Sequence, residues 1–322
     1  MKAMVLTRFG GPDAFELRDV PVPAPGPRQV RVAVRATAVN PLDLQIRRGD
    51  YKDFVRLPAV IGHDVSGVVD AVGEAVTEFA PGDAVYYTPR IFGGPGSYAE
   101  RHVVDADLVA RKPRNLTHAE AASLTLVGGT VWEALVTRAR VEVGETVLVH
   151  GGAGGVGAIA VQVARAGGAR VLATCRAADA DFVRGLGADA AIDFETEDHI
   201  AAVLRLTDGR GADVALDTVG GDTLTRIPRA LAPFGRVVTL VDLATPQNLI
   251  EAWGKNATYH FVFTRQERGK LDAFTALVER GLVRPVVGAV LPFEEIPRAH
   301  DLLERGLGRA GIRGKIAVEV AP

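Results

Sequence analysis

The sequence predicts an α/β protein with two domains, one built on a parallel β-sheet with helices on both faces and one made mostly of β-strands. Two observations carry this prediction. Short apolar runs alternate with helical stretches through the middle of the chain, and the first third is rich in Val, Pro and Gly with a period-2 alternation. The length of 322 residues fits about two domains of ~100–200 residues each.

The mostly β part is expected in the first third. Residues 29–39 (QVRVAVRATAV) alternate apolar and polar side chains, which is typical of a half-buried strand. Two further strands are expected at 65–73 and 82–89, where Gly and Pro mark the ends.

The parallel sheet is expected after a helix-rich stretch at 118–139. Short apolar runs then alternate with helical stretches, at 146–149, 170–175, 190–193, 214–219, 236–241 and 259–264. Such alternation favours parallel strands with helices on both faces. The chain continues as helix, strand, helix and strand, at 271–281, 285–292, 294–306 and 315–320.

Composition excludes several partners and sites. The net charge of −2 gives no electrostatic case for nucleic acid or an anionic membrane. Cys175 is the only cysteine, which excludes an internal disulfide and a zinc site of several thiolates and fits a reducing compartment. Residues 1–20 lack the apolar core of a signal peptide, and no apolar run approaches the ~20 residues of a membrane span. We therefore expect a cytoplasmic protein.

A glycine cluster at 150–157 (HGGAGGVG) points to a phosphate ligand. It holds G-x-G-x-x-G between an apolar strand and a helix, the context that a dinucleotide fingerprint requires. The first glycine makes the turn, the second lets a pyrophosphate approach the backbone, and the third lets the helix pack on the strand. The cofactor is therefore expected on the loop Gly152, Ala153, Gly154, Gly155, Val156 and Gly157. The alternative is a tight turn without a ligand.

The end of the next strand favours NADPH over NADH. In NAD-specific folds a carboxylate about 20 residues on holds the ribose 2′-hydroxyl. Here Thr174, Cys175 and Arg176 stand at that place, with no carboxylate. Arg176 can pair with a 2′-phosphate. The alternative is that Arg176 is a solvated surface residue. Cys175 is expected to pack or to line the adenosine rather than to react.

Further motifs run in order along the chain: NPLDLQIRRGDY (40–51), GHDVSGVVDAVG (62–73), GSYAE (96–100), VGGTVWEALV (127–136), LGADAAID (186–193), LDTVGG (216–221) and RGKIAV (313–318). With the glycine loop they resemble the medium-chain dehydrogenase/reductase superfamily, in particular its zinc-independent quinone oxidoreductase branch, the relatives of zeta-crystallin. The resemblance implies a GroES-like substrate domain at 1–124 and 266–322 and a Rossmann domain at 125–265, with the active site in the cleft between them. It also implies a homodimer formed through the sheet edge at 236–241 and 259–264.

The resemblance bears on a metal as well. Zinc-dependent relatives bind catalytic zinc through an early cysteine, a His-Glu pair and a later cysteine or acid. Here Asn40 replaces the first cysteine, and the later segment LTLVGGT has neither a thiolate nor a carboxylate. Only His63 and Asp64 remain, fewer than the three protein ligands of a catalytic zinc. We therefore expect no metal and interpret His63 as a remnant or as a cleft-lining polar group.

The expected reaction is hydride transfer from NADPH to a quinone or an α,β-unsaturated carbonyl, since such acceptors delocalise the developing charge themselves. The resemblance implies that Asn40, Asp43 and Tyr51 line the substrate side. Asn40 would donate an amide N–H to an oxyanion, and Tyr51 would bind the substrate or pass a proton through water. The alternative for Asp43 is a buried partner of Arg47 or Arg48.

The resemblance implies further cofactor contacts at Thr130, Phe194, Val219, Phe261, Phe263 and Lys315. Thr130 would lie near the nicotinamide, Phe194 would stack beside the adenosine, and Lys315 would touch cofactor or substrate. For the two later phenylalanines the alternative is sheet packing. Three other functions stay open: an enoyl-thioester reductase, a zinc alcohol dehydrogenase, and a non-catalytic NADPH-binding protein.

Overall fold

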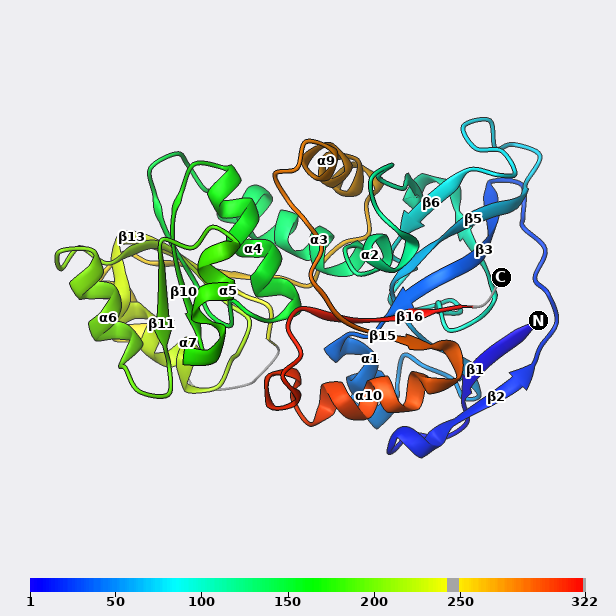
Figure 1. Ribbon diagram of the computed structural model, residues 1–322, viewed down its shortest axis with the longest axis horizontal. Coiled ribbons are helices and arrows are strands. Elements are labelled where there is room, and N and C mark those ends of the chain that lie inside the picture. Colours follow the sequence, from blue (N-terminus) through cyan, green and yellow to red (C-terminus); the bar gives the residue numbers. More distant parts are fainter. Residues whose placement is uncertain (242–248, 321–322) are drawn as a thin grey trace. The chain divides into compact units, whose positions relative to one another are not determined.

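The computed structural model describes residues 1–241 and 249–320 and divides into two compact units (Figure 1). Unit 1 comprises Met1–Gly129, Gln266–Arg280 and Pro285–Pro322, and unit 2 comprises Thr130–Arg265 and Gly281–Arg284. The sequence places the boundaries at 124/125 and 265/266. In the structure the later division also lies after Arg265, but residues 281–284 return to unit 2, and the earlier division lies inside helix α3 (Thr125–Val131).

Unit 1 is the expected mostly β part. Its strands are β1 (Lys2–Leu6), β2 (Phe15–Asp19), β3 (Gln29–Ala38), β4 (Ala59–Val60), β5 (Val65–Val72), β6 (Ala84–Tyr87), β7 (Arg101–Asp105), β8 (Ala110–Arg111), β15 (Val287–Pro292) and β16 (Lys315–Glu319). One sheet has the order β2-β1-β4. The larger one has the order β15-β16-β3-β5-β6-β8, with β7 also paired to β3.

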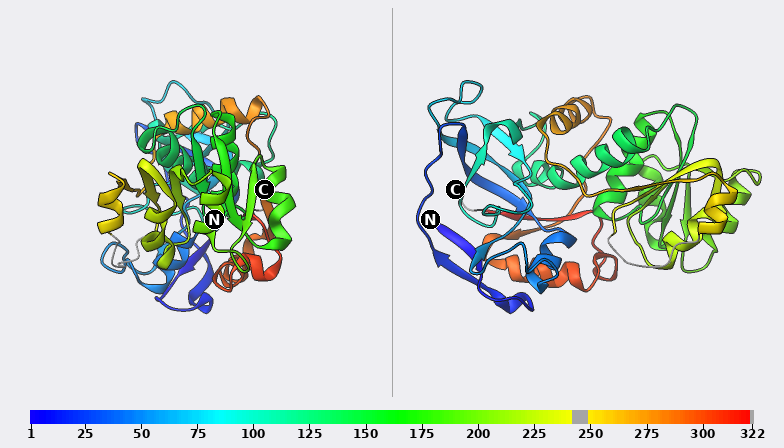
Figure 2. Two further views of the ribbon diagram at one scale, coloured as in Figure 1. Left: turned by 90° about the vertical axis from the view of Figure 1, so that its left-hand side faces the viewer. Right: turned by 180° about the vertical axis from the view of Figure 1, so that it is seen from behind.

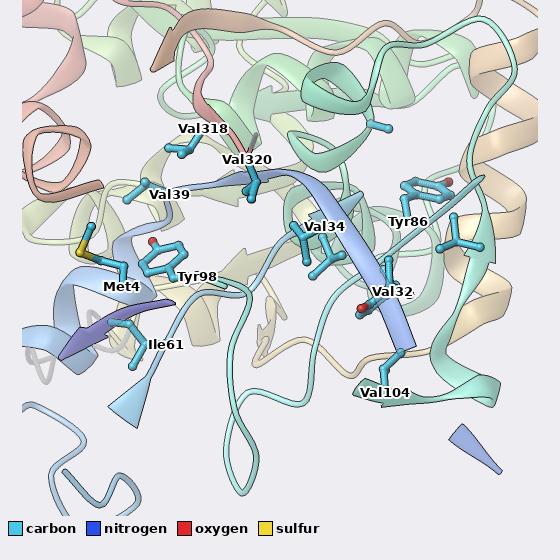
Figure 3. Packing of buried hydrophobic residues seen from close by; sticks show 14 of the residues in the cluster. Met4, Val32, Val34, Val39, Ile61, Tyr86, Tyr98, Val104, Val318 and Val320 are labelled. Carbon is cyan, nitrogen blue, oxygen red and sulfur yellow. The ribbon is translucent and has the colours of Figure 1, made fainter. Parts of the chain in front are cut away.

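Strand β3 is the centre of the larger sheet. Its predicted alternation is confirmed, because Val30, Val32 and Val34 are almost fully buried in the core. Figure 3 shows Val32 and Val34 among their core neighbours. The last strand, β16, runs antiparallel to β3 with Ala317 opposite Ala38. Figure 2 shows β16 in red between orange β15 and blue β3. This register places Lys315 opposite Asn40, which lies two residues after the end of β3.

The helices of unit 1 follow their sequence signals. They are α1 (Pro41–Arg48), α2 (His118–Ala122), most of α3, α9 (Arg268–Glu279) and α10 (Ile296–Glu304). Helix α1 starts with Pro41 directly after Asn40 and ends at Gly49, whose φ of 96° is left-handed. Helix α10 lies beside α1 (Figure 1).

Unit 2 contains the expected parallel sheet. Its strands are β9 (Thr146–Val149), β10 (Arg170–Cys175), β11 (Ala190–Asp193), β12 (Ala212–Asp217), β13 (Leu231–Thr239) and β14 (Thr258–Phe261). The order is β11-β10-β9-β12-β13-β14, and every pair is parallel. The helices are α4 (Gly155–Ala166), α5 (Ala180–Gly185), α6 (His199–Leu206), α7 (Asp222–Arg226) and α8 (Leu249–Gly254). A π-helical turn, η3 (Trp132–Arg138), precedes the first strand.

The strand order of unit 2 indicates at which edge of the sheet a ligand would bind. From β9 the chain moves outward through β10 and β11, then returns to β12 on the other side of β9. Because all strands are parallel, their carboxyl ends share one edge, and ligands of such sheets bind where the strand order reverses. The glycine loop follows β9, Arg176 follows β10, Phe194 follows β11 and Val219 follows β12. Across residues 1–241 and 249–320, no helix combines the length and apolarity needed to cross a membrane.

Candidate functional site

The glycines of the loop between β9 and α4 serve different purposes. A Cβ on Gly157 would lie 2.1 Å from the carbonyl oxygen of Gly151, and one on Gly152 would lie 2.9 Å from the Cβ of Ala173. Packing of the loop therefore requires glycine at both positions. Gly154 is different. Its φ of −78° suits any residue, and a Cβ there would meet only the Gly151 oxygen, at 3.3 Å. The fold thus requires glycine less strictly here than at the other two positions, and the approach of a pyrophosphate to this backbone stays a prediction.

Thr174 holds the loop in place. Its hydroxyl oxygen accepts a hydrogen bond from the Gly151 N–H at 3.1 Å, and its carbonyl oxygen accepts one from the Gly152 N–H at 2.8 Å. The side chain is buried, so it positions the loop from behind. At the start of α4 the N–H groups of Gly155, Val156 and Gly157 have no acceptor within the helix, which suits an anion.

The two residues at the end of β10 differ in character. Cys175 is buried, and burial raises the pKa of its thiol to about 11, so it is a packing residue with little thiolate at neutral pH. Arg176 is partly exposed, and its Nε lies 3.1 Å from Oε1 of Glu195. Arg176 is thus held at the ligand edge by an ion pair that was not expected from the sequence.

Four apolar residues of the predicted cofactor site are unusually exposed. Phe194, Val219, Phe261 and Phe263 each have more than half of their surface accessible. The first two follow β11 and β12, and Phe261 ends β14, all at the carboxyl edge of the sheet. Sheet packing therefore does not account for the two later phenylalanines. Thr130 lies in α3 and is partly buried.

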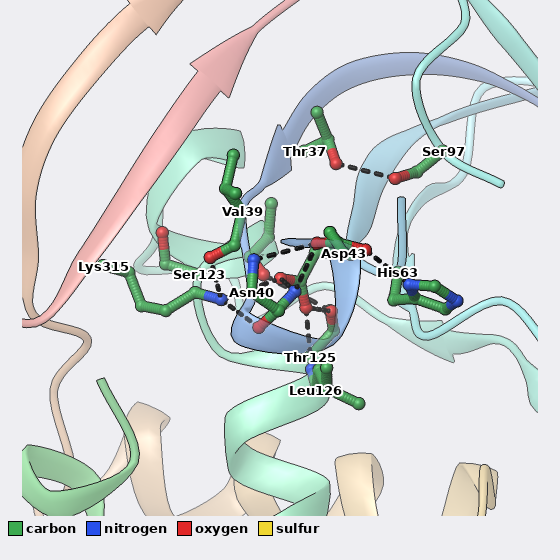
Figure 4. Close-up of polar contacts among 12 residues, drawn as sticks. Thr37, Val39, Asn40, Asp43, His63, Ser97, Ser123, Thr125, Leu126 and Lys315 are labelled. Atoms are coloured by element: carbon green, nitrogen blue, oxygen red, sulfur yellow. Dashed lines mark hydrogen bonds and ion pairs between the residues drawn. The ribbon is translucent and has the colours of Figure 1, made fainter. Parts of the chain in front are cut away.

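Unit 1 contains a buried group of interacting side chains, here called the polar cluster: Asn40, Asp43, His63, Asp64, Thr125 and Lys315 (Figure 4). It draws on the start of α1, the segment before β5, the start of α3 and the start of β16. It holds two carboxylates, one lysine and one histidine, so its charges balance when the histidine is protonated. Buried charges are tolerated when they are paired in this way.

Asp64 is the hub of the polar cluster. Its Oδ1 accepts hydrogen bonds from the Thr125 hydroxyl and from the Leu126 N–H, the latter at 2.8 Å. Its Oδ2 accepts from Asn40 Nδ2 at 2.7 Å and from Lys315 Nζ at 3.1 Å. Asp64 thereby fixes the first turn of α3 and the Asn40 amide together.

Asn40 and Lys315 are both fully engaged within unit 1. The second N–H of the Asn40 amide points to Asp43 Oδ2 at 3.3 Å, and its Oδ1 accepts from Lys315. Lys315 also donates to the carbonyl oxygen of Val39 at 3.0 Å. These contacts favour a positioning role for Lys315, although the sequence suggests a ligand contact. The role of Asn40 as an oxyanion donor stays a prediction, and it requires release of one of these bonds.

Asp43 pairs with His63, not with an arginine. His63 Nδ1 lies 2.5 Å from Asp43 Oδ1, and Nε2 lies 3.1 Å from the carbonyl oxygen of Ile91. Arg47 and Arg48 both pair with Glu304, so the alternative partner for Asp43 was wrong. Burial opposes both charges, but the mutual attraction outweighs it. The pKa of Asp43 is therefore lowered and that of His63 raised. Both ring nitrogens lie within hydrogen-bond distance of an oxygen, and the raised pKa favours the protonated form of His63.

The hydrogen bonds of Asn40, His63 and Asp64 show whether the polar cluster could bind a zinc ion. Asn40 offers no thiolate, both nitrogens of His63 are used, and all acceptor positions of Asp64 are filled. Throughout the described part of the chain, no group of three or more His, Cys, Asp or Glu side chains is arranged to hold a metal. The residues therefore do not fit a catalytic zinc.

A pocket of about 330 Å³ opens beside the polar cluster in unit 1. Its walls are mostly apolar and include Ile46, Phe54, Ile61, Ile91 and Phe92, with His63 among them. The rings of Phe54 and Phe92 are stacked, with centroids 5.0 Å apart. Tyr51 is not a wall residue, but its ring lies 5.3 Å from that of Phe92. The sequence did not reveal the two phenylalanines, because they come from separate loops without a local pattern.

Comparison with known families agrees with this arrangement. Residues 26–114 match the family described as alcohol dehydrogenase GroES-like domain, and residues 186–318 match the family described as zinc-binding dehydrogenase. The second description names a metal that the polar cluster does not fit.

Individual relatives cover nearly the whole chain. The quinone oxidoreductase of Lama guanicoe is 33% identical over 97% of this chain and 96% of its own length. The chloroplastic NADPH-dependent alkenal/one oxidoreductase of Arabidopsis thaliana is 36% identical over 94% of this chain and 76% of its own. The crystal structure of an alcohol dehydrogenase superfamily protein from Novosphingobium aromaticivorans has a TM-score of 0.92 and 39% identity, with full coverage of both chains. The chain therefore belongs to the medium-chain dehydrogenase/reductase superfamily of oxidoreductases and is similar throughout to its quinone oxidoreductases.

Proposed function

We propose that this protein is an NADPH-dependent reductase that transfers hydride to quinones or α,β-unsaturated carbonyls without a metal. The observation that carries the proposal is the loop between β9 and α4. There Gly154 leaves its backbone open although the fold requires glycine less strictly than at Gly152 and Gly157. The Arabidopsis relative is an NADPH-dependent alkenal/one oxidoreductase, which supports both the cofactor and the substrate class.

The residues present fit a dinucleotide. The backbone from Gly152 to Gly157 would hold the pyrophosphate, and Arg176 would pair with the 2′-phosphate. The exposed side chains that follow β11 and β12, Phe194 and Val219, would cover apolar parts of the cofactor. When bound, the reduced nicotinamide supplies the hydride.

The pocket beside His63 supports a small, flat acceptor. Ligand pockets commonly enclose about 300–1,000 Å³, and this one lies at the lower end of that range. Its stacked phenylalanines suit a planar apolar ring or enone. Negative charge that develops on the acceptor oxygen needs stabilisation, and the His63 imidazolium in the pocket wall supplies positive charge there. Tyr51 and one released N–H of Asn40 are the proposed hydrogen-bond donors.

Assembly and location complete the proposal. The edge strand β14 and the preceding helix α8 expose Trp253, Ile250 and Phe261. These surfaces support a homodimer formed along that edge of the sheet. The single free cysteine fits a cytoplasmic location.

The test is anaerobic oxidation of NADPH, followed by absorbance, with a panel of quinones, enals and enones, and with NADH in parallel. Turnover on quinones or enones is expected. Tight binding of NADPH without turnover on any of them would overturn the enzymatic proposal. Metal analysis of the purified active protein tests whether the reaction is metal-free, since stoichiometric zinc would contradict that part of the proposal.

A further inference from the structure

An ion pair at the ligand edge of unit 2 brings an acidic residue to the place where a 2′-phosphate is expected. Arg176 is the first residue after β10, and Glu195 comes two residues after the end of β11. These strands are parallel neighbours, with Cys175 opposite Asp193. The register therefore carries both side chains to the same point, where Nε of Arg176 meets Oε1 of Glu195 at 3.1 Å.

The backbone that carries Glu195 is well fixed. The Phe194 N–H donates to the carbonyl oxygen of Cys175 at 3.2 Å, which continues the pairing of the two strands. The Glu195 N–H donates to Asp193 Oδ1 at 3.2 Å, and the Thr196 hydroxyl donates to Asp193 Oδ2 at 2.7 Å. Glu195 is thus presented by an ordered turn, although 54% of its side chain is exposed. Its nearness to Arg176 follows from the register of two strands.

The charges around this point do not favour a phosphate strongly. Asp179 and Asp193 both lie close enough to Cys175 to raise the pKa of its thiol, after the larger effect of burial. The next arginine along the chain, Arg184, lies near enough to the same thiol to act in the opposite direction on its pKa, but it pairs with Asp181 at the surface. Arg176 directly follows β10, and a carboxylate already holds its Nε.

We propose that Glu195 is a specificity-determining residue that weakens the preference for NADPH and allows NADH to be used as well. This inference rests on the proposed function, since it concerns the same cofactor site. Glu195 competes with the 2′-phosphate for the Arg176 guanidinium and repels the phosphate directly. Toward NADH the same carboxylate is favourable or neutral, because a carboxylate accepts a hydrogen bond from a ribose 2′-hydroxyl.

The experiment measures dissociation constants of NADPH and NADH by the fluorescence change of the nicotinamide, for the wild type and E195Q. In E195Q the NADPH affinity should rise about three- to tenfold, because exposed charge pairs have modest effects and the phosphate carries nearly two charges. The NADH affinity should stay the same or fall. The competitors 2′,5′-ADP and 5′-ADP should show the same difference, which assigns it to the 2′-phosphate.

E197Q is the matched control. Glu197 lies two residues further along the same turn, and its removal changes the net charge equally, but it pairs with Arg205 and not with Arg176. Its ratio of NADPH to NADH affinity should match the wild type. An E195Q ratio equal to that of E197Q, or an equal change for both cofactors, would overturn the inference.

R176A separates this inference from the proposed function. R176A should weaken NADPH much more than NADH. If it does and E195Q leaves the ratio unchanged, NADPH recognition stands and the role of Glu195 is wrong. If E195Q raises the ratio while R176A leaves it unchanged, Glu195 acts on the phosphate directly. In that case Arg176 is not the phosphate ligand of the proposed function.

Discussion

Gly154 and Gly157 stand three residues apart in one loop, yet they should respond differently to the same added methyl group. In Gly154→Ala the Cβ meets only the Gly151 oxygen, at 3.3 Å, so the free energy of unfolding should change by less than ~1 kcal/mol. NADPH affinity should fall more than tenfold, because the methyl group occupies the approach of the pyrophosphate.

In Gly157→Ala the Cβ would lie 2.1 Å from a backbone oxygen, so the loop or helix must move. That variant should lose about 2 kcal/mol or more of stability. Urea unfolding and NADPH titration of both proteins check the pair. Unchanged NADPH binding by a folded Gly154→Ala protein would mean that the loop is only a turn.

Lys315 is the single lysine of the polar cluster, and its removal leaves Asp64 without a counter-charge. Breaking a buried pair from one side costs about 3–5 kcal/mol. Lys315→Met should therefore destabilise unit 1 by roughly this amount, since the Val39 carbonyl and Asn40 Oδ1 lose their donor as well.

Asp64→Asn combined with Lys315→Met tests the pairing itself. The double variant should lose less stability than the sum of the two single variants, by more than ~1 kcal/mol. The measurement is urea unfolding of all four proteins by circular dichroism. Additive losses would show that the two side chains are not energetically coupled.

The elements show how far the sequence alone reaches. Strands such as β3 and β9, and the parallel sheet of unit 2, were predictable because their signals are local: a period of two, or an apolar run between helices. The first two strands, β1 and β2, were missed because no clear alternation sets them apart from their surroundings.

The sites were predictable in proportion to how local they are. The glycine loop is contiguous, so its pattern was readable. The polar cluster is assembled by pairing between β16 and β3, which joins Lys315 to Asn40 across most of the chain. The ion pair of Arg176 and Glu195 likewise depends on which strand lies beside β10. A sequence pattern does not encode which strands pair or in what register. The site residues themselves could therefore be predicted, but the side chains that they contact could not.

Helix α8 and strand β14 form an exposed apolar edge that a partner subunit should cover. Ile250 and Trp253 on α8 are each more than four-fifths exposed. Exposed groups of this size on a sheet edge favour association. In light scattering the wild type should have about twice the chain mass of 34.0 kDa. Ile250→Arg with Trp253→Arg should give the monomer mass. Val143→Arg is the control, since Val143 is equally exposed but lies three residues before β9, which is an inner strand of the sheet. A monomeric wild type would contradict the proposed dimer.

Across the whole molecule, buried histidines should make the fold sensitive to acid. Burial lowers the pKa of His102 and His300 in unit 1 to about 4, and that of His150 in unit 2 to about 3. In the unfolded chain these groups take up protons as the pH falls through about 6.5, while the folded chain does not. The unfolded state thus binds more protons, so stability falls from about pH 6.5 down to about pH 4. His63 differs, because its raised pKa means that it is already charged in the fold and gives no such loss.

His150 should carry a measurable part of the acid sensitivity of unit 2. Both tryptophans, Trp132 and Trp253, lie in unit 2, so their fluorescence follows the unfolding of the unit that contains His150. Between pH 6 and pH 4 this histidine should account for a loss of about 1.4 kcal/mol per pH unit. In His150→Met the slope should be smaller by about that amount. The variant loses one long hydrogen bond to Thr174 and the edge-on ring contact with His199, while Nε2 of His150 has no hydrogen-bond partner within the described residues. Equal slopes for wild type and variant would mean that His150 takes up its proton in the folded state, and the acid response of unit 2 would then come from other groups such as His199 and His260, whose pKa values burial also lowers.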